Sequence, residues 1–214
     1  MTEKEQLKLT ADFVRAKLEG EGTGHDWWHI YRVWQNAKTI ALQEGGNGFV
    51  IELASLLHDI ADHKFHDGDE TVGPRVAQEF LITLSLENEI VMQVIRIMNE
   101  ISFSKGMKPS SLEGRIVQDA DRLDAIGAIG IARAFAYGGF KEREIYNPEI
   151  PPSQYATNEE YKKNTNPTLN HFYEKLLLLK DLMNTKTAIE LAQKRHTFME
   201  NYLDQFYQEW DGKR

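Results

Sequence analysis

Residues 52–62 read ELASLLHDIAD, and this stretch decides the fold. Its large apolar residues recur at intervals of three and four, which places them on one face of a helix. They are Leu53, Leu56, Leu57 and Ile60. The predicted helix covers 52–60 and carries His58 and Asp59 at its carboxyl end. Because an unpaired carboxylate is costly to bury, either a bound cation or solvent at an ordinary helix end must satisfy this pair.

The same apolar spacing predicts helices along nearly the whole chain. Asp26 is a possible N-cap for the second helix, and Gly45-Gly46 ends it. No segment alternates convincingly as a strand. The predicted fold class is therefore all-α, a compact multi-helix bundle with a C-terminal helical extension. The predicted helices, besides 52–60, are 4–19, 26–44, 70–84, 87–101, 111–135, 168–182 and 185–209.

The predicted organisation is one domain over residues 1–214, with a core at about 20–136 and C-terminal helices 168–209 packing on it. Residues 137–167 hold four of the six prolines and form a long irregular connection. Loops of this length are often lids. The aromatic residues of this connection either stack on a bound base, cover a site or pack without contacting a ligand. The sequence does not decide whether the connection moves. They are Phe140, Tyr146, Tyr155 and Tyr161.

The composition of the chain excludes several classes of function. The chain has no cysteine, which excludes disulfides, thiolate metal sites and cysteine nucleophiles, so any metal must sit on His, Asp or Glu. A net charge of -8 argues against a broad surface for duplex nucleic acid. No apolar run approaches the ~20 residues of a membrane span, and the first residues lack the order of a signal peptide. We expect a cytoplasmic protein without a membrane partner.

Four of the seven histidines lie between His25 and His63, beside Asp26, Asp59 and Asp62. This density indicates a metal site, although a single histidine on a helix is more often a packed or exposed residue.

Three blocks carry a resemblance to a known family. His29, then LLHDIADHKF at 56–65, then DADRLDAIGAIGIAR at 119–133 resemble the HD-domain phosphohydrolases, whose signature is H…HD…D. The resemblance implies one divalent cation held by His29, His58, Asp59 and Asp121. Two imidazoles and two carboxylates would suit Mn²⁺ or Mg²⁺, with Fe²⁺, Co²⁺, Ni²⁺ and Zn²⁺ also open. Asp119 and Asp124 are rivals for the last ligand. The C-terminal part resembles small bacterial members associated with nucleoside triphosphate pyrophosphohydrolysis.

Residues around these blocks are candidates for the chemistry. Asp62 follows Asp59 by three residues, so on a continuing helix it would face the same cleft as general base; the alternative is a solvated carboxylate. Lys64 is a candidate to neutralise charge on phosphoryl oxygens. Binuclear members of the resembled family carry further histidines downstream of the His-Asp pair. Between Asp59 and Asp121 this chain has only His63 and His66, close after the pair, so a second metal is not expected. His25 and Asp26 are candidates to support a ligand.

Cations on the helices are candidates for binding phosphate groups, or else they are solvated or paired helix charges. They are Arg32, Arg122, Lys175 and Arg195. The favoured function is a metal-dependent phosphohydrolase that splits a nucleoside or deoxynucleoside triphosphate and releases pyrophosphate. The alternatives are a nucleotide phosphatase or phosphodiesterase, a non-catalytic nucleotide-sensing module and a purely structural helical protein. The expected partner is a small phosphorylated substrate; a homodimer is compatible with the sequence.

Overall fold

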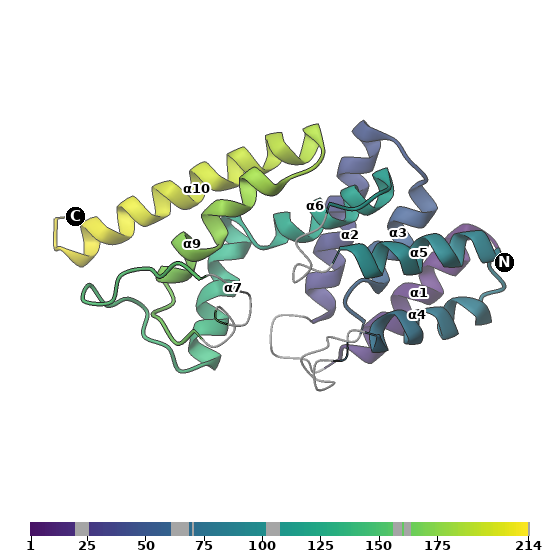
Figure 1. The fold of residues 1–214 in the computed structure, drawn as a ribbon, viewed down its shortest axis with the longest axis horizontal. Coiled ribbons are helices and arrows are strands. Elements are labelled where there is room, and N and C mark those ends of the chain that lie inside the picture. The colour runs from purple at the N-terminus through teal and green to yellow at the C-terminus, as the bar shows by residue number, and fades with distance from the viewer. Residues whose placement is uncertain are drawn as a thin grey trace. The chain divides into compact units, whose positions relative to one another are not determined.

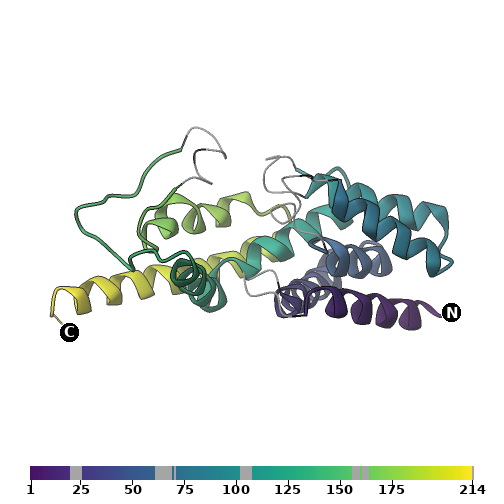
Figure 2. The ribbon, with the colours of Figure 1, turned by 90° about the horizontal axis from the view of Figure 1, so that it is seen from below.

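The structure is a computed structural model, and it describes residues 1–19, 26–60, 69, 71–101, 108–155, 160 and 164–213. Within these ranges every regular element is a helix (Figures 1 and 2). The predicted all-α fold class is therefore confirmed. None of the described helices is long and apolar enough to cross a membrane.

The chain divides into two compact units, Met1–Asp121 and Arg122–Arg214. Each is described by itself. The predicted single domain over 1–214 stays a prediction. Helix α6 runs through the division, because it covers Leu112–Asp124 and leaves its last three residues in the second unit.

The first unit is built around α3. This helix packs on α1, α2 and α5, and α4 packs on α5. Eight of its ten residues are buried, which explains why its sequence is apolar on nearly every side. The elements are α1 (Glu3–Lys17), α2 (Trp27–Glu44), α3 (Gly48–Leu57), α4 (Val72–Thr83), α5 (Asn88–Glu100) and α6 (Leu112–Asp124).

Side-chain caps fix where the two central helices begin. Asp26 accepts a hydrogen bond from the His29 amide at 2.9 Å and so starts α2, as the sequence predicts. Asn47 accepts bonds from the amides of Phe49 and Val50 and starts α3 at Gly48. Helix α3 thus begins four residues before the predicted start at 52, and it ends at Leu57, with His58 as its cap.

The second unit contains α7 (Gly127–Phe140), α9 (Asn170–Glu174), the 3₁₀ helix η3 (Leu176–Leu182) and α10 (Lys186–Trp210). Helix α10 packs on α7 and η3, and α9 packs on η3. The predicted helix over 168–182 is wrong as one element, because Lys175 has φ -146° and separates α9 from η3.

The predicted helix over 111–135 is also wrong, since α6 ends at Asp124 and α7 begins at Gly127. Gly127 has φ +77°, a left-handed conformation that favours glycine. A Cβ on Gly127 would lie 3.0 Å from Cβ and Cγ of Arg195. The break therefore depends on both the backbone freedom and the small size of glycine.

The described part of the connection after α7 is bonded to the helices of its own unit. Thr168 and Leu169 donate amide bonds to the carbonyls of Glu144 and Ile145. The Glu174 carboxylate accepts bonds from the amide of Ser153, the side chains of Asn164 and Asn166, and the Tyr155 hydroxyl. Tyr146 packs edge-on against Phe206, Tyr207 and Trp210 of α10. Tyr161 lies outside the described residues.

Candidate metal centre

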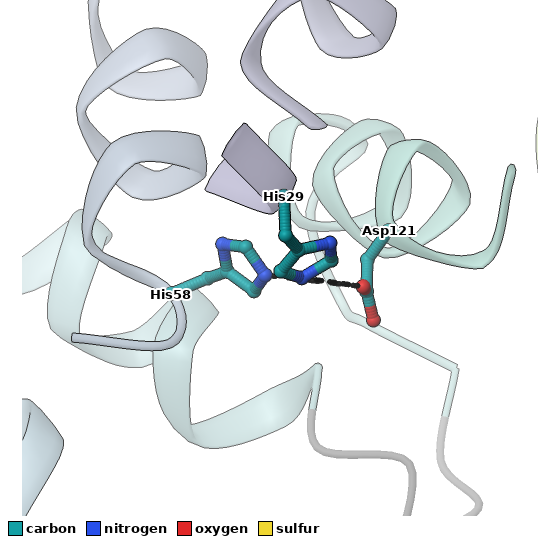
Figure 3. A group of neighbouring side chains, drawn as sticks. All are labelled: His29, His58 and Asp121. Atoms are coloured by element: carbon teal, nitrogen blue, oxygen red, sulfur yellow. Dashed lines mark ion pairs between the residues drawn. The ribbon is translucent and has the colours of Figure 1, made fainter. Parts of the chain in front are cut away.

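Three elements of the first unit bring three side chains to one point (Figure 3). His29 comes from the first turn of α2, His58 follows α3 and Asp121 comes from α6. One ligand atom from each lies within 4.8 Å of the other two. Asp121 Oδ1 is 3.5 Å from Nε2 of His29 and 3.8 Å from Nε2 of His58. Such a cluster of two nitrogens and one oxygen has the spacing and the donor atoms of a metal centre.

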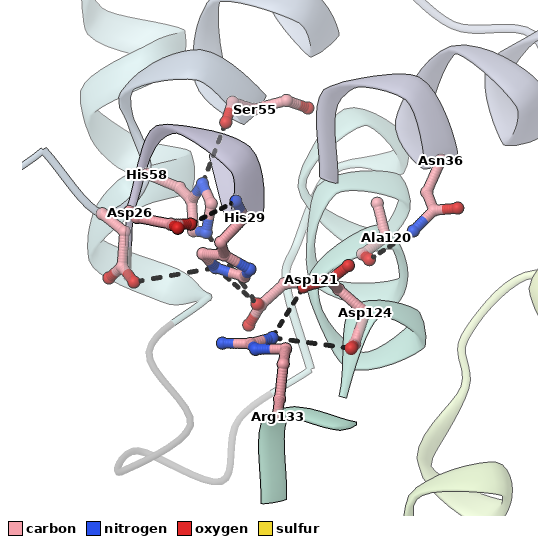
Figure 4. Close-up of polar contacts among 10 residues, drawn as sticks. Asp26, His29, Asn36, Ser55, His58, Ala120, Asp121, Asp124 and Arg133 are labelled. Atoms are coloured by element: carbon pink, nitrogen blue, oxygen red, sulfur yellow. Dashed lines mark hydrogen bonds and ion pairs between the residues drawn. The ribbon is translucent and has the colours of Figure 1, made fainter. Parts of the chain in front are cut away.

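The backbone orients His58. Its Nδ1 lies 2.9 Å from the carbonyl oxygen of Ser55, which can only accept, so Nδ1 carries the proton (Figure 4). Nε2 then holds a lone pair. Within the described ranges this buried Nε2 has no hydrogen-bond partner, and the side chain is 4% exposed. A buried lone pair aimed at a second imidazole and a carboxylate fits a cation at that point.

The start of α2 places His29. Asp26 caps the helix through the His29 amide, and the His29 side chain is 1% exposed. Its ring meets that of His58 edge to face, with centroids 5.4 Å apart. The two imidazoles are therefore buried on one side of the cluster, whereas the Asp121 side chain is 39% exposed.

The remaining carboxylates predicted as ligands or rivals occupy different positions. Asp59 Oδ2 is 3.9 Å from His29 Nε2, but Asp59 is not in the mutually close group. Asp119 is fully buried on α6 and is not in the group either. Asp124, in the second unit, is bound by Arg133 Nη1 at 2.6 Å (Figure 4). Of the three neighbouring aspartates, the cluster contains Asp121.

Comparison with known proteins identifies the family. The model of the HD domain family matches residues 27–126, a range that holds His29, His58, Asp59 and Asp121. The YpgQ protein of Bacillus subtilis is 40% identical over 99% of this chain and 97% of its own length. The chain belongs to the HD superfamily of hydrolases. The predicted family is thereby confirmed.

Solved HD structures cover almost the whole chain. An HD-superfamily hydrolase from Bacillus thuringiensis is 46% identical, with a TM-score of 0.79 over 98% of this chain and 99% of the other. The structure of B. subtilis YpgQ in complex with ADP is 38% identical, with a TM-score of 0.79 over 98% and 97%. The similarity thus extends past the matched HD domain into the C-terminal helices.

Several predicted site residues of this HD protein cannot be placed. Asp62 and Lys64, predicted as general base and catalytic cation, lie outside the described residues. The same holds for His25, His63 and His66. Their roles stay predictions.

The predicted phosphate-binding cations are not gathered into one described cluster. Arg32 is half-buried on α2, one turn after His29. In the second unit, Arg122 and Arg195 donate bonds to the carbonyls of Leu182 and Leu123. Lys175 is half-buried between α9 and η3. Burial lowers the pKa of Arg195, and the charge of Asp124 opposes this. Arg122 and Arg195 thus have structural bonds, and their substrate contacts stay predictions.

Two of the contacts described above leave no signal in the sequence. The Ser55 carbonyl acts through its backbone, which any residue type at that position supplies. Arg133 binds Asp124 from another helix, nine residues along the chain and across the break between α6 and α7. Only the folded arrangement reveals either contact.

Proposed function

We propose that this HD hydrolase is a metal-dependent phosphohydrolase acting on a nucleotide, with His29, His58 and Asp121 as metal ligands and Asp59 completing the set. The observation that carries the proposal is the buried Nε2 of His58, whose Nδ1 is committed to Ser55 and which faces His29 and Asp121. Two imidazoles with carboxylates suit one Mn²⁺ or Mg²⁺; Fe²⁺, Co²⁺, Ni²⁺ and Zn²⁺ also suit these donors.

The chain's own residues divide the work. The buried imidazoles of His29 and His58 hold fixed lone pairs on one side, and the exposed part of Asp121 opens the other side to substrate and solvent. A bound divalent ion would supply Lewis acidity toward a phosphate oxygen and lower the pKa of water. We assign Asp62 to accept the proton of the attacking water and Lys64 to neutralise charge on the phosphoryl oxygens.

The nucleotide substrate is supported by a relative. YpgQ, which matches this chain over nearly its whole length, has been crystallised with ADP. We propose a nucleoside or deoxynucleoside triphosphate as the substrate and pyrophosphate as the product. The extra negative charge of a triphosphate would be matched by cations along its length, for which Arg32, Arg122, Lys175 and Arg195 are the proposed contacts.

Product analysis tests the reaction. The metal-stripped protein would be given Mn²⁺ or Mg²⁺ and a panel of nucleoside mono-, di-, tri- and cyclic phosphates, and the products would be separated by anion exchange. We expect a monophosphate and pyrophosphate in equal amounts from triphosphates. Release of inorganic phosphate alone would indicate a phosphatase, and ring opening of cyclic substrates a phosphodiesterase. Nucleotide binding without turnover would indicate a sensing module and would overturn the enzyme proposal.

A further inference from the structure

Asn36 links the helix that carries His29 to the helix that carries Asp121. Its Nδ2 donates a hydrogen bond to the carbonyl oxygen of Ala120 at 3.3 Å (Figure 4). Ala120 directly precedes Asp121 on α6. Asn36 follows His29 by seven residues on α2, which is two helical turns or about 10 Å, so both side chains lie on the same face.

The Asp121 carboxylate depends on the position of its helix. Among the described residues no hydrogen bond holds this carboxylate; its Oδ1 approaches Nε2 of His29 and Nε2 of His58. The side chain is 39% exposed, so close packing does not fix it either. Where Oδ1 can reach is therefore set by the backbone of α6 at this turn.

Polar contacts join α2 and α6 at the centre. One is the approach of His29 Nε2 to Asp121 Oδ1 at 3.5 Å, and another is the Asn36–Ala120 bond. Loss of the second contact removes one of the restraints on this turn of α6, so we expect a small rotation or slide of the helix there. A shift of this size moves a carboxylate out of bonding distance, because metal–oxygen bonds tolerate only tenths of an ångström.

We propose that Asn36 is a positioning residue for the metal centre, which holds Asp121 in register with His29 and His58 by binding the Ala120 carbonyl. This inference rests on the proposed function, because it takes His29, His58 and Asp121 as metal ligands. In this role Asn36 is not itself a ligand. It acts on metal affinity through α6.

Mn²⁺ binding by the full chain, measured by titration calorimetry after metal stripping, tests the role. Asn36→Leu keeps the size of the side chain and removes the donor. Asn36→Asp keeps the shape of the side chain but places a carboxylate oxygen, which can only accept a hydrogen bond, toward the Ala120 carbonyl. We expect Kd for Mn²⁺ to rise about tenfold or more in both variants, the range seen when a group supporting a metal ligand is lost.

Gln6→Met is the matched control. Gln6 Nε2 donates to the Leu84 carbonyl at 3.1 Å, which is also an amide-to-backbone bond between two segments of the first unit. Neither α1 nor the end of α4 carries a proposed ligand. We expect Gln6→Met to lower the melting temperature about as much as Asn36→Leu and to leave the Kd for Mn²⁺ unchanged.

The outcomes separate this inference from the function on which it rests. Asn36→Leu with wild-type Mn²⁺ affinity would overturn the positioning role, provided that His58→Ala has lost binding. An equal loss of affinity in Gln6→Met and Asn36→Leu would overturn it too, since general destabilisation would explain both. Wild-type affinity in His58→Ala would overturn the metal centre itself, and the role of Asn36 with it.

Discussion

His58 Nδ1 donates a hydrogen bond to the Ser55 carbonyl oxygen, one turn back along the chain, at 2.9 Å. This bond sets the tautomer and the direction of the imidazole, which leaves the buried Nε2 to face Asp121 at 3.8 Å. His58→Ala should therefore lower Mn²⁺ affinity more than about tenfold. Ser55→Ala keeps the carbonyl and removes only the hydroxyl bond to Ile51, so its Mn²⁺ affinity should match wild type. Equal losses in the two variants would contradict this account of the bond.

The neighbouring aspartates of α6 should separate by their functions. Asp121→Asn is expected to lose Mn²⁺ binding with little change in stability. Asp124, whose side chain is 2% exposed, instead pairs with Arg133 at 2.6 Å. Because Asp124→Asn would weaken this buried ion pair, we expect it to lower the free energy of unfolding by about 2 kcal/mol and to leave Mn²⁺ affinity unchanged. Urea unfolding and calorimetric titration of both variants check this. Loss of Mn²⁺ by a folded Asp124→Asn would make Asp124 the ligand.

Adjacent glycines near the end of α7 offer a matched pair for testing the packing of the second unit. A Cβ on Gly138 would lie 2.0 Å from Thr168 Oγ1, whereas a Cβ on Gly139 would meet nothing within 4 Å. Gly138→Ala should destabilise the protein by about 1–3 kcal/mol through overpacking. Gly139→Ala should be neutral or stabilise by up to about 1 kcal/mol, since alanine favours the helix. Urea midpoints of the two variants in the reverse order would contradict the described packing.

The stability of the chain should fall in mild acid because of His171. Burial, with smaller effects from Lys175 and Arg143, lowers the pKa of His171 from 6.5 to about 3. Between these values the unfolded chain binds a proton that the folded chain does not, so stability is retained above pH 6.5 and is lost as pH falls toward 3. This contribution should cost about 1–2 kcal/mol between pH 7 and pH 5.

The matched variant for this pH effect is His171→Gln, which cannot titrate. Its free energy of unfolding should depend less on pH than that of wild type over pH 5–7, as measured by urea unfolding. Parallel curves for the two proteins would show that His171 is not responsible.

The sequence alone predicts much of the fold, because helix periodicity and caps are local. The Asp26 cap and the Gly45 stop bound α2 where expected. Other boundaries depend on features that the pattern hides. Asn47 looks like part of a Gly-rich breaker yet caps α3. The apolar spacing continues across residues 124–127, although the backbone breaks there to let α10 approach Gly127.

The candidate site is predictable only in part for the same reason. The family resemblance points to His29, His58, Asp59 and Asp121, and the structure brings His29, His58 and Asp121 into one mutually close group. Choosing Asp121 over Asp119 and Asp124 by physical reasoning requires knowing which face of α6 is buried and which partner Arg133 takes. The burial of α6 and the Arg133–Asp124 contact both depend on the tertiary structure and cannot be read from the sequence. Asn36 carries no signal at all, because its partner is a backbone carbonyl 84 residues away.

The central claim is that hydrolysis depends on one divalent ion held by His29, His58 and Asp121. The most direct test adds Mn²⁺ stepwise to metal-stripped protein and measures bound metal and pyrophosphate release from a triphosphate in the same samples, with His58→Ala alongside. The account predicts that turnover rises in proportion to occupancy, saturates at about one Mn²⁺ per chain and is absent in His58→Ala. Pyrophosphate release by metal-free protein, or full turnover by His58→Ala, would contradict it.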